Sequence, residues 1–207
     1  MDPEFLIDGP DGGTTVVLAH GAGAAMDSPF METVAWGLAG AGFRVVRFEF
    51  PYMRARRTEG KRPGPNRAPV LIDTWKEVIA GFGPPARLII GGKSMGGRIA
   101  SLIADESGVR GLICLGYPFH PPGKPERTRT EHLAALATPT LILQGTRDRL
   151  GMPDEVSRYA LSPEISLHWF EAGDHSFKPT KASGRTETEN LEEAIATAAA
   201  FVNGLAA

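Results

Sequence analysis

The stretch LIIGGKSMGGR, residues 88–98, can be read in two ways that lead to different chemistries. Its left part, GGKS, ends like the phosphate-binding loop G-x-x-x-x-G-K-[ST]. Its centre, GGKSMGG, contains G-x-S-x-G, a sharp strand-to-helix turn that presents a nucleophilic serine. A phosphate loop would need a glycine at position 87, where the chain has Arg87, and the intervening LIIG is typical of a strand. The stretch therefore favours a serine turn with Ser94 at its apex.

By itself this pattern leaves a structural alternative open, because five residues recur by chance. Ser94 is then either a nucleophile or a small residue that only caps the helix after a glycine-rich turn. Gly92 and Gly96 fit both interpretations, since each stands where a side chain would collide with a neighbouring strand or helix. The rest of the sequence has to decide between them.

Around this stretch, short β-branched runs alternate with helical patterns, which predicts an α/β fold with a mostly parallel sheet and helices on both faces. Helices are expected after Ser28, from near Asp73, and over about residues 188–205. Between them, segment 51–69 lacks periodicity and indicates a long surface loop. The predicted strands cover residues 15–20, 44–50, 86–92, 111–116, 140–145 and 166–171.

Length and composition restrict the function further. A chain of 207 residues is expected to form one domain, 1–207, with residues 1–5 (MDPEF) a possible cloning remnant. Its formal net charge of −2 gives no general attraction to nucleic acid or to an anionic membrane. The single cysteine, Cys114, excludes an internal disulfide, and no apolar run approaches the ~18 residues of a membrane span. We expect a soluble, cytoplasmic protein that binds neither nucleic acid nor membranes.

The residues that follow other predicted strands favour the nucleophile interpretation. An acyl-transfer serine needs a base, an acid that orients the base, and backbone amides aimed at the developing oxyanion. After a G-x-S-x-G turn these appear in the order Ser, Asp or Glu, His, each just past a strand. Asp148 and His175 occupy such places, and the N–H groups of Ala22 and Met95 are the expected oxyanion donors.

Other polar residues have simpler interpretations. Asp174 is a weaker candidate for the acid than Asp148, because a direct neighbour of His175 seldom points at the far ring nitrogen. We expect His20 to be a structural hydrogen-bonding residue. No metal and no cofactor are expected, since GAGAAM lacks the third glycine of a dinucleotide fingerprint and no H-E-x-x-H occurs. The remaining histidines lack this strand-end context and are expected at the surface or in packing: His120, His132 and His168.

The motifs LAHGAGA, RFEFPYM, GGKSMGGRIA, GYPFHPPGKPE, PTLILQGTRDRLG and GDHSF together resemble the α/β-hydrolase superfamily. More narrowly, they resemble the compact predicted hydrolases of the KANL3/Tex30-like group. The resemblance implies a triad of Ser94, Asp148 and His175. The chain departs from the full fold in two ways, because the sequence lacks the first strands of the full sheet and the long insertion of a lid, so a small version with little or no lid is expected.

The sequence thus predicts a serine hydrolase, esterase-like, acting on a small-molecule acyl substrate through an acyl-enzyme. Two alternatives stay open: an interaction module that keeps the fold without turnover, and a peptidase or thioesterase with the same triad. The oligomeric state is not predicted. Segment 51–69 is either a solvated loop or a roof over the site, where Arg54, Arg56 and Arg57 would attract anionic acyl substrates.

Overall fold

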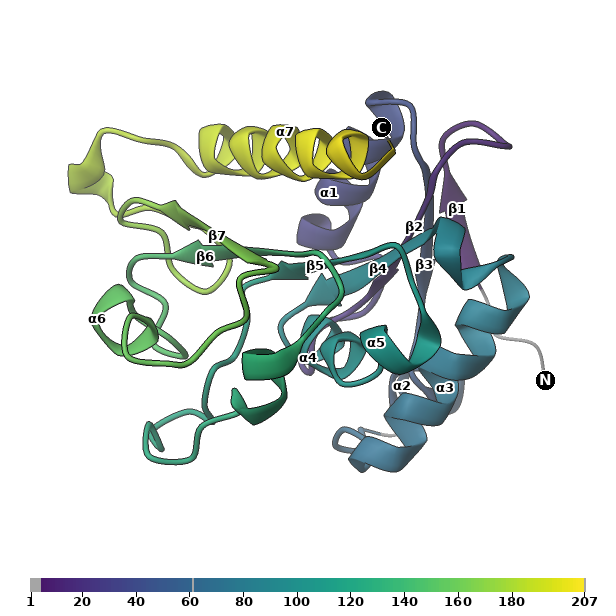
Figure 1. Ribbon diagram of the computed structural model, residues 1–207, viewed down its shortest axis with the longest axis horizontal. Helices are drawn as coiled ribbons and strands as arrows, with labels where there is room; N and C mark the ends of the chain where they lie inside the picture. The colour runs from purple at the N-terminus through teal and green to yellow at the C-terminus, as the bar shows by residue number, and fades with distance from the viewer. Residues whose placement is uncertain (1–4, 61, 207) are drawn as a thin grey trace.

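Seven strands form one sheet in the order β1-β3-β2-β4-β5-β6-β7. The computed structural model describes residues 5–60 and 62–206, and Figure 1 shows the sheet crossing the middle of the molecule. Strand β1 pairs antiparallel with β3, and every other described pair is parallel. The strands are β1 (Phe5–Asp8), β2 (Thr15–Ala19), β3 (Arg44–Phe48), β4 (Leu88–Lys93), β5 (Gly111–Leu115), β6 (Thr140–Gly145) and β7 (Ile165–Phe170).

Helices cover both faces of the sheet (Figure 1). One face carries α1 (Pro29–Gly40) and α7 (Glu187–Ala206). The opposite face carries α2 (Pro51–Glu59), α3 (Ala68–Gly81), α4 (Met95–Ser101) and α5 (Ala104–Ser107). Shorter helical segments are α6 (Pro153–Val156), η1 (Pro85–Arg87), η2 (Glu131–Ala135) and η3 (Lys181–Ser183).

Two hydrophobic cores result, one on each side of the sheet. Because successive side chains of a strand point to opposite faces, Val17 and Ala19 of β2 enter the core that contains Trp75 of α3. Val16 and Leu18 enter the core beneath α1 and α7. All residues of β2 are buried, as expected for a strand covered on both faces.

Cys114 of β5 lies in this buried layer with 1 % of its surface exposed. A Cβ atom added at Gly97 of α4 would lie 3.2 Å from the Cys114 Sγ, so the thiol is directly beneath the first turns of α4. Burial raises the pKa of the thiol well above its ordinary value. Cys114 is therefore a packing residue, as its apolar surroundings in the sequence indicate.

The fold class expected from the sequence is confirmed, and each of the six predicted strands is present with ends within two residues of those predicted. Strand β1 was not predicted, because four residues at an antiparallel edge carry too little pattern. Residues 1–4 lie outside the described part, whereas Phe5 begins β1 and pairs with Phe48. Ser28 does precede α1, but its side chain makes no capping hydrogen bond.

The predicted surface loop over residues 51–69 is wrong in its first half. Helix α2 begins at Pro51, buries Tyr52 and Met53, and ends at Gly60, whose φ of +65° suits a glycine. Two adjacent buried residues give no helical periodicity, which explains the error. Helix α3 also starts earlier than Asp73, at Ala68. Lys61 lies outside the described residues.

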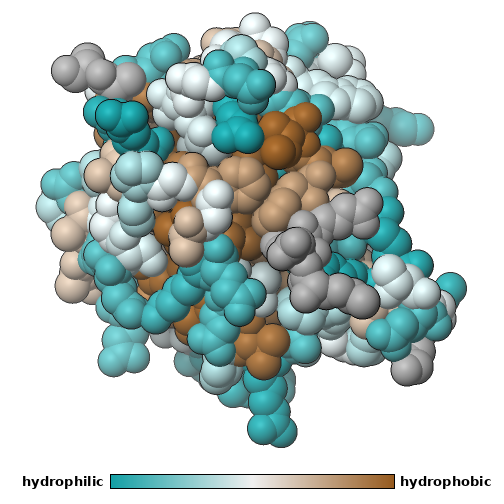
Figure 2. All heavy atoms as spheres, turned by 90° about the vertical axis from the view of Figure 1, so that its right-hand side faces the viewer, coloured by the Kyte–Doolittle hydropathy of each residue, from teal (hydrophilic) through white to brown (hydrophobic). Residues whose placement is uncertain are grey.

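The connection from β5 to β6 contains only the short segment η2 and adds no separate layer over the sheet. This agrees with the expected absence of a lid domain. Figure 2 views the molecule from the side of β1 and α3 and shows apolar side chains gathered between polar ones. Ile7 of β1 and Val70 of α3 are among the exposed large apolar residues. No helix in the described ranges is long and apolar enough to span a bilayer.

Candidate active site

The candidate residues come together at the edge of the sheet where the parallel strands end. Ser94 directly follows β4, and Asp148 lies three residues after β6. His175 follows β7, and Ala22 lies three residues after β2. Because these strands run parallel and side by side, their carboxyl ends deliver the four residues to one place, where open α/β sheets commonly bind ligands.

The turn at Ser94 depends on close backbone contacts. Ser94 has φ +51° and ψ −112°, a conformation that L-residues rarely adopt and that lifts its side chain out of the turn. A Cβ at Gly92 would lie 2.0 Å from the carbonyl oxygen of Ala19, and one at Gly96 would lie 2.5 Å from the same oxygen. Only glycine fits at these two positions, so the glycines of the motif keep α4 against β2.

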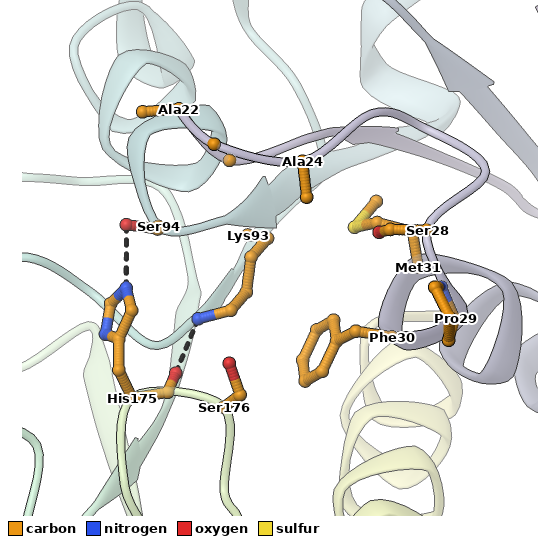
Figure 3. A pocket seen from close by; sticks show the side chains of 12 residues that line it. Ala22, Ala24, Ser28, Pro29, Phe30, Met31, Lys93, Ser94, His175 and Ser176 are labelled. Carbon is orange, nitrogen blue, oxygen red and sulfur yellow. Dashed lines mark hydrogen bonds between the residues drawn. The ribbon is translucent and has the colours of Figure 1, made fainter.

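His175 connects the serine with a carboxylate, and Figure 3 shows its contact with the serine. Its Nε2 lies 2.8 Å from the Ser94 Oγ, and its Nδ1 lies 2.7 Å from Asp148 Oδ2. Because an ionised carboxylate can only accept, Nδ1 carries the proton and Nε2 is free to accept the hydrogen bond from the serine hydroxyl. The three residues therefore form the connected arrangement that an activated serine requires.

Asp148 is fully buried and each of its oxygens accepts hydrogen bonds. Oδ1 accepts from the Leu150 N–H at 2.9 Å, and Oδ2 accepts from the Gln144 side-chain amide at 2.8 Å as well as from His175. These donors fix the plane of the carboxylate. Asp174, the weaker sequence candidate, instead accepts from backbone N–H groups of its own loop, at Ser176 and Lys178.

The two expected oxyanion donors belong to residues near Ser94. The N–H of Met95 is the first of α4, and the first four N–H groups of a helix have no partner within it. Ala22 borders Ser94 in two adjoining pockets. Its carbonyl oxygen accepts a hydrogen bond from the Tyr52 hydroxyl at 3.0 Å, and the carbonyl of Gly21 lies 3.1 Å from the same hydroxyl. Tyr52 thus holds the loop that follows β2.

His20 stabilises the same loop, as expected from the sequence. Its Nδ1 donates to the Gly21 carbonyl at 2.6 Å and its Nε2 accepts from the Phe50 N–H at 3.1 Å. Burial is the main cause that lowers the pKa of His20, which keeps the ring neutral and able to accept that hydrogen bond. The ring therefore connects the ends of β2 and β3.

Lys93 is a charged residue in an apolar strand, and the fold buries it beside Ser94. Its Nζ donates to the backbone carbonyl of His175 at 2.5 Å and lies 5.3 Å from the ring centre of Phe30 (Figure 3). Burial lowers the pKa of Lys93 to about 8, against the opposing effect of Asp148 and Asp174. The lysine connects the end of β4 with the loop that carries the histidine.

Two pockets meet at Ser94. The first, of about 390 Å³, is bordered by Phe30, Met31 and small residues of the loop after β2, and its surface is mainly apolar (Figure 3). The second, of about 430 Å³, lies on the side of α4 and contains Arg98. Ala22 borders both. Ser94 therefore has separate space on two sides.

A second serine–histidine pair occurs on the α4 face of the sheet. His132 Nε2 lies 2.8 Å from the Ser101 Oγ and 3.5 Å from the Tyr117 hydroxyl. The pair is compatible with serine chemistry, but Ser101 is buried and its Oγ also contacts the Arg98 carbonyl at 2.7 Å. No carboxylate contacts His132 in the described ranges, so this pair lacks the orienting acid that His175 has.

Two other histidines each contact a carboxylate. His120 lies 3.4 Å from Glu155, and His168 lies 2.8 Å from Glu193. Neither ring has a serine hydroxyl as a partner among the described residues. Within the same residues, no group of three or more histidine, cysteine or acidic side chains could hold a metal ion.

Two arginines of segment 51–69 bind protein oxygens. Arg57 forms ion pairs with Glu49 and Asp27, and Arg56 donates twice to the Pro63 carbonyl. None of Arg54, Arg56 and Arg57 borders the two pockets at Ser94. The alternative in which this segment roofs the site stays a prediction without structural support.

Sequence reasoning missed three supporting residues. Gln144 stands out only as a polar residue in the apolar run TLILQG, and Lys93 only as a cation at the end of LIIGGK. Both signals were available, because a polar residue in a buried strand needs a partner. Tyr52 gave no such signal, since its contact with the loop after β2 joins residues 30 positions apart.

The comparisons with known proteins agree with this geometry. A family model described as an alpha/beta hydrolase domain matches residues 12–203. The chain belongs to the α/β-hydrolase family. A solved structure from Xanthomonas campestris, described as a serine hydrolase without lid, matches with 19 % identity and a TM-score of 0.68, over 94 % of this chain and 87 % of that one.

Two further solved structures share the fold of this α/β-hydrolase. A serine hydrolase homologue from Coxiella burnetii has 21 % identity and a TM-score of 0.67, over 98 % of this chain and 91 % of that one. A monoacylglycerol lipase from Paleococcus ferrophilus has 16 % identity and a TM-score of 0.71, over 97 % and 100 %. At these identities the likeness concerns the fold.

Proposed function

We propose that this α/β-hydrolase is a serine esterase that cleaves small carboxylic esters through an acyl-enzyme, with Ser94, His175 and Asp148 as its catalytic residues. One observation carries the proposal. The His175 ring contacts the Ser94 Oγ at 2.8 Å through one nitrogen and Asp148 at 2.7 Å through the other. On its sequence motifs we place the chain with the compact KANL3/Tex30-like hydrolases.

In the first half of the reaction, the Ser94 Oγ attacks the carbonyl carbon of the ester while His175 Nε2 takes the hydroxyl proton. The carbonyl π electrons move to oxygen, and the N–H groups of Ala22 and Met95 stabilise the resulting oxyanion. The tetrahedral intermediate then collapses. The bond to the leaving alcohol breaks, His175 returns its proton to that alcohol, and Ser94 keeps the acyl group.

In the second half, water replaces the alcohol. His175 Nε2 takes a proton from the water, whose oxygen attacks the acyl carbon, and the bond to Ser94 Oγ breaks as that oxygen regains the proton. The products are a carboxylic acid and the free enzyme. Throughout, buried Asp148 holds the ring and stabilises its positive charge, while no cofactor enters a step.

The space around Ser94 supports small acyl substrates. Pockets of about 390 and 430 Å³ are at the lower end of the range for small-molecule sites. Esterases and lipases occur among structures with the same fold, such as the monoacylglycerol lipase. Thioester and amide cleavage would use the same groups, so the choice of a carboxylic ester is part of the proposal.

The test combines an activity-based probe with a substrate panel. A fluorophosphonate should label the wild-type chain at Ser94, and mass spectrometry of the digested adduct should locate it there. The p-nitrophenyl esters from acetate to decanoate should then show which acyl length is cleaved fastest. A folded chain that takes up no label and cleaves none of these esters would instead favour an interaction module that keeps the fold without turnover.

A further inference from the structure

The second pocket at Ser94 contains two arginines on different segments. Arg98 lies on α4, one helical turn after Ser94, and Arg129 lies on the connection between β5 and β6. Both line the pocket of about 430 Å³ that also contains Ser94 and Met95. The rest of the lining includes Leu71, Pro118, Pro122 and Leu150, which are apolar.

Neither guanidinium has an acidic partner in the part of the chain that the structure describes. No carboxylate of the described residues forms an ion pair with Arg98 or Arg129, and the Nε of Arg98 is buried without a hydrogen-bond partner. Burial is the main cause that lowers the pKa of both side chains. For Arg129, the positive charge of Arg98 adds to this effect. The two cations thus lie close enough to repel each other.

Two other arginines, the buried Arg47 and the more exposed Arg57, do have acidic partners. Arg47 pairs with Asp8, and Arg57 pairs with Glu49 and Asp27, each at 2.9 Å or less. Removing a guanidinium from water without an acidic partner is unfavourable, and a bound anion would offset that cost. The planar arginine fork binds carboxylate and phosphate groups with two hydrogen bonds.

We propose that this pocket is an anion subsite, in which Arg98 and Arg129 bind a carboxylate or phosphate group of the ester while its carbonyl carbon lies at Ser94. The inference rests on the proposed esterase function and specifies its substrate class. The anionic group belongs either to the acyl part or to the alcohol part of the ester. Both sources present the same chemistry to the two arginines.

Two matched pairs of esters distinguish these sources. The first compares mono-p-nitrophenyl adipate with p-nitrophenyl hexanoate, which have acyl chains of equal length with and without a terminal carboxylate. The second compares 4-acetoxybenzoate with its methyl ester, where the charge is on the leaving group. For each pair the measured quantity is the ratio of kcat/KM for the anionic ester to kcat/KM for the neutral one.

The wild-type ratio should favour the anionic ester in one pair, and that pair identifies the part of the substrate that carries the charge. Arg98→Gln and Arg129→Gln should each lower this ratio by roughly tenfold or more, as expected for a lost hydrogen bond to a charged group. Arg87→Gln is the matched control, because Arg87 is exposed and precedes β4 at the opposite edge of the sheet. It should leave the ratio unchanged.

Thermal midpoints and fluorophosphonate labelling show whether each variant is folded. Because the two arginines lie on separate segments, a single folded variant is enough to test the subsite. If wild type cleaves the neutral esters and prefers neither anion, the anion subsite is overturned while the esterase function stands. Ratios that fall equally in Arg87→Gln also overturn it. A wild-type chain that neither reacts with the probe nor cleaves any of the four esters overturns both.

Discussion

Replacing Asp148 by asparagine tests the proposed site most directly, because the hydrogen bonds around this carboxylate leave no good orientation for an amide. Oδ1 accepts from the Leu150 N–H, while Oδ2 accepts from Gln144 and His175. If the new NH₂ group takes the Oδ2 position, it faces two donors. If it takes the Oδ1 position, it faces the Leu150 N–H. In each orientation, the NH₂ group of the asparagine therefore faces at least one N–H donor of the protein.

The first orientation is the one that affects the chemistry. An amide donor facing Nδ1 favours the imidazole tautomer whose proton is on Nε2, and that tautomer cannot accept the Ser94 proton. Amidation of the acid in a known triad lowers turnover by ~10⁴, and we expect ~10³ to 10⁴ for Asp148→Asn. This loss corresponds to roughly 4 to 5.5 kcal/mol of transition-state stabilisation. A buried donor without an acceptor costs about 1–3 kcal/mol of folding stability in addition.

The assay is steady-state hydrolysis of the best p-nitrophenyl ester, with thermal midpoints measured in parallel. Asp174→Asn is the matched control, since its Oδ1 accepts only from backbone N–H groups of the same loop. This control should lose less than about tenfold in turnover. Turnover of Asp148→Asn within tenfold of wild type would refute the reasoning. A larger loss in Asp174→Asn would also refute it and would place the acid on the other loop.

Three more outcomes are expected. Ser94→Ala should abolish hydrolysis and probe labelling with a near wild-type thermal midpoint, and a labelled variant would reject Ser94 as nucleophile. Tyr52→Phe removes the hydroxyl that holds Gly21 and Ala22, so it should lower the free energy of unfolding by about 1 kcal/mol and should also lower turnover. An unchanged turnover would contradict this. Burial lowers the pKa of Lys93 from 10.5 to about 8. Between these pH values the unfolded chain keeps a proton that the folded chain has released, so stability should rise with pH by up to about 3 kcal/mol from this group. The unfolding free energy of Lys93→Met, measured with urea, should rise less with pH over this range than that of wild type. An equal pH dependence in variant and wild type would contradict this prediction.

The sequence predicted the positions of Ser94, Asp148 and His175 because each depends on local information. A glycine-rich turn follows one apolar run, and polar residues follow two others. In a parallel sheet the strand ends meet at one edge, so correct strands almost suffice to bring these residues together. The predicted strand ends were accurate because fully buried strands are nearly continuous apolar runs, such as those around Val17 and Ile142.

What the sequence did not predict depends on contacts between distant residues. Helix α2 is stabilised by Tyr52 and Met53 packing into the core rather than by a periodic face, so its residues resemble a polar loop. In the sequence Arg57 is one of six basic residues of segment 51–69, whereas in the structure it forms ion pairs with Glu49 and Asp27. Sequence counts charges, but only the fold shows which of them are neutralised.

The position of Cys114 allows its thiol to report local opening between α4 and the sheet. Its thiol is the only one in the sequence, and in the native state it is enclosed beneath α4. A thiol reagent can react with Cys114 only when α4 separates from the sheet beneath it. The modification rate under native conditions therefore measures how often that opening occurs. Comparing this rate before and after phosphonylation of the enzyme would show whether occupancy of the site tightens the sheet below it, with no mutation introduced.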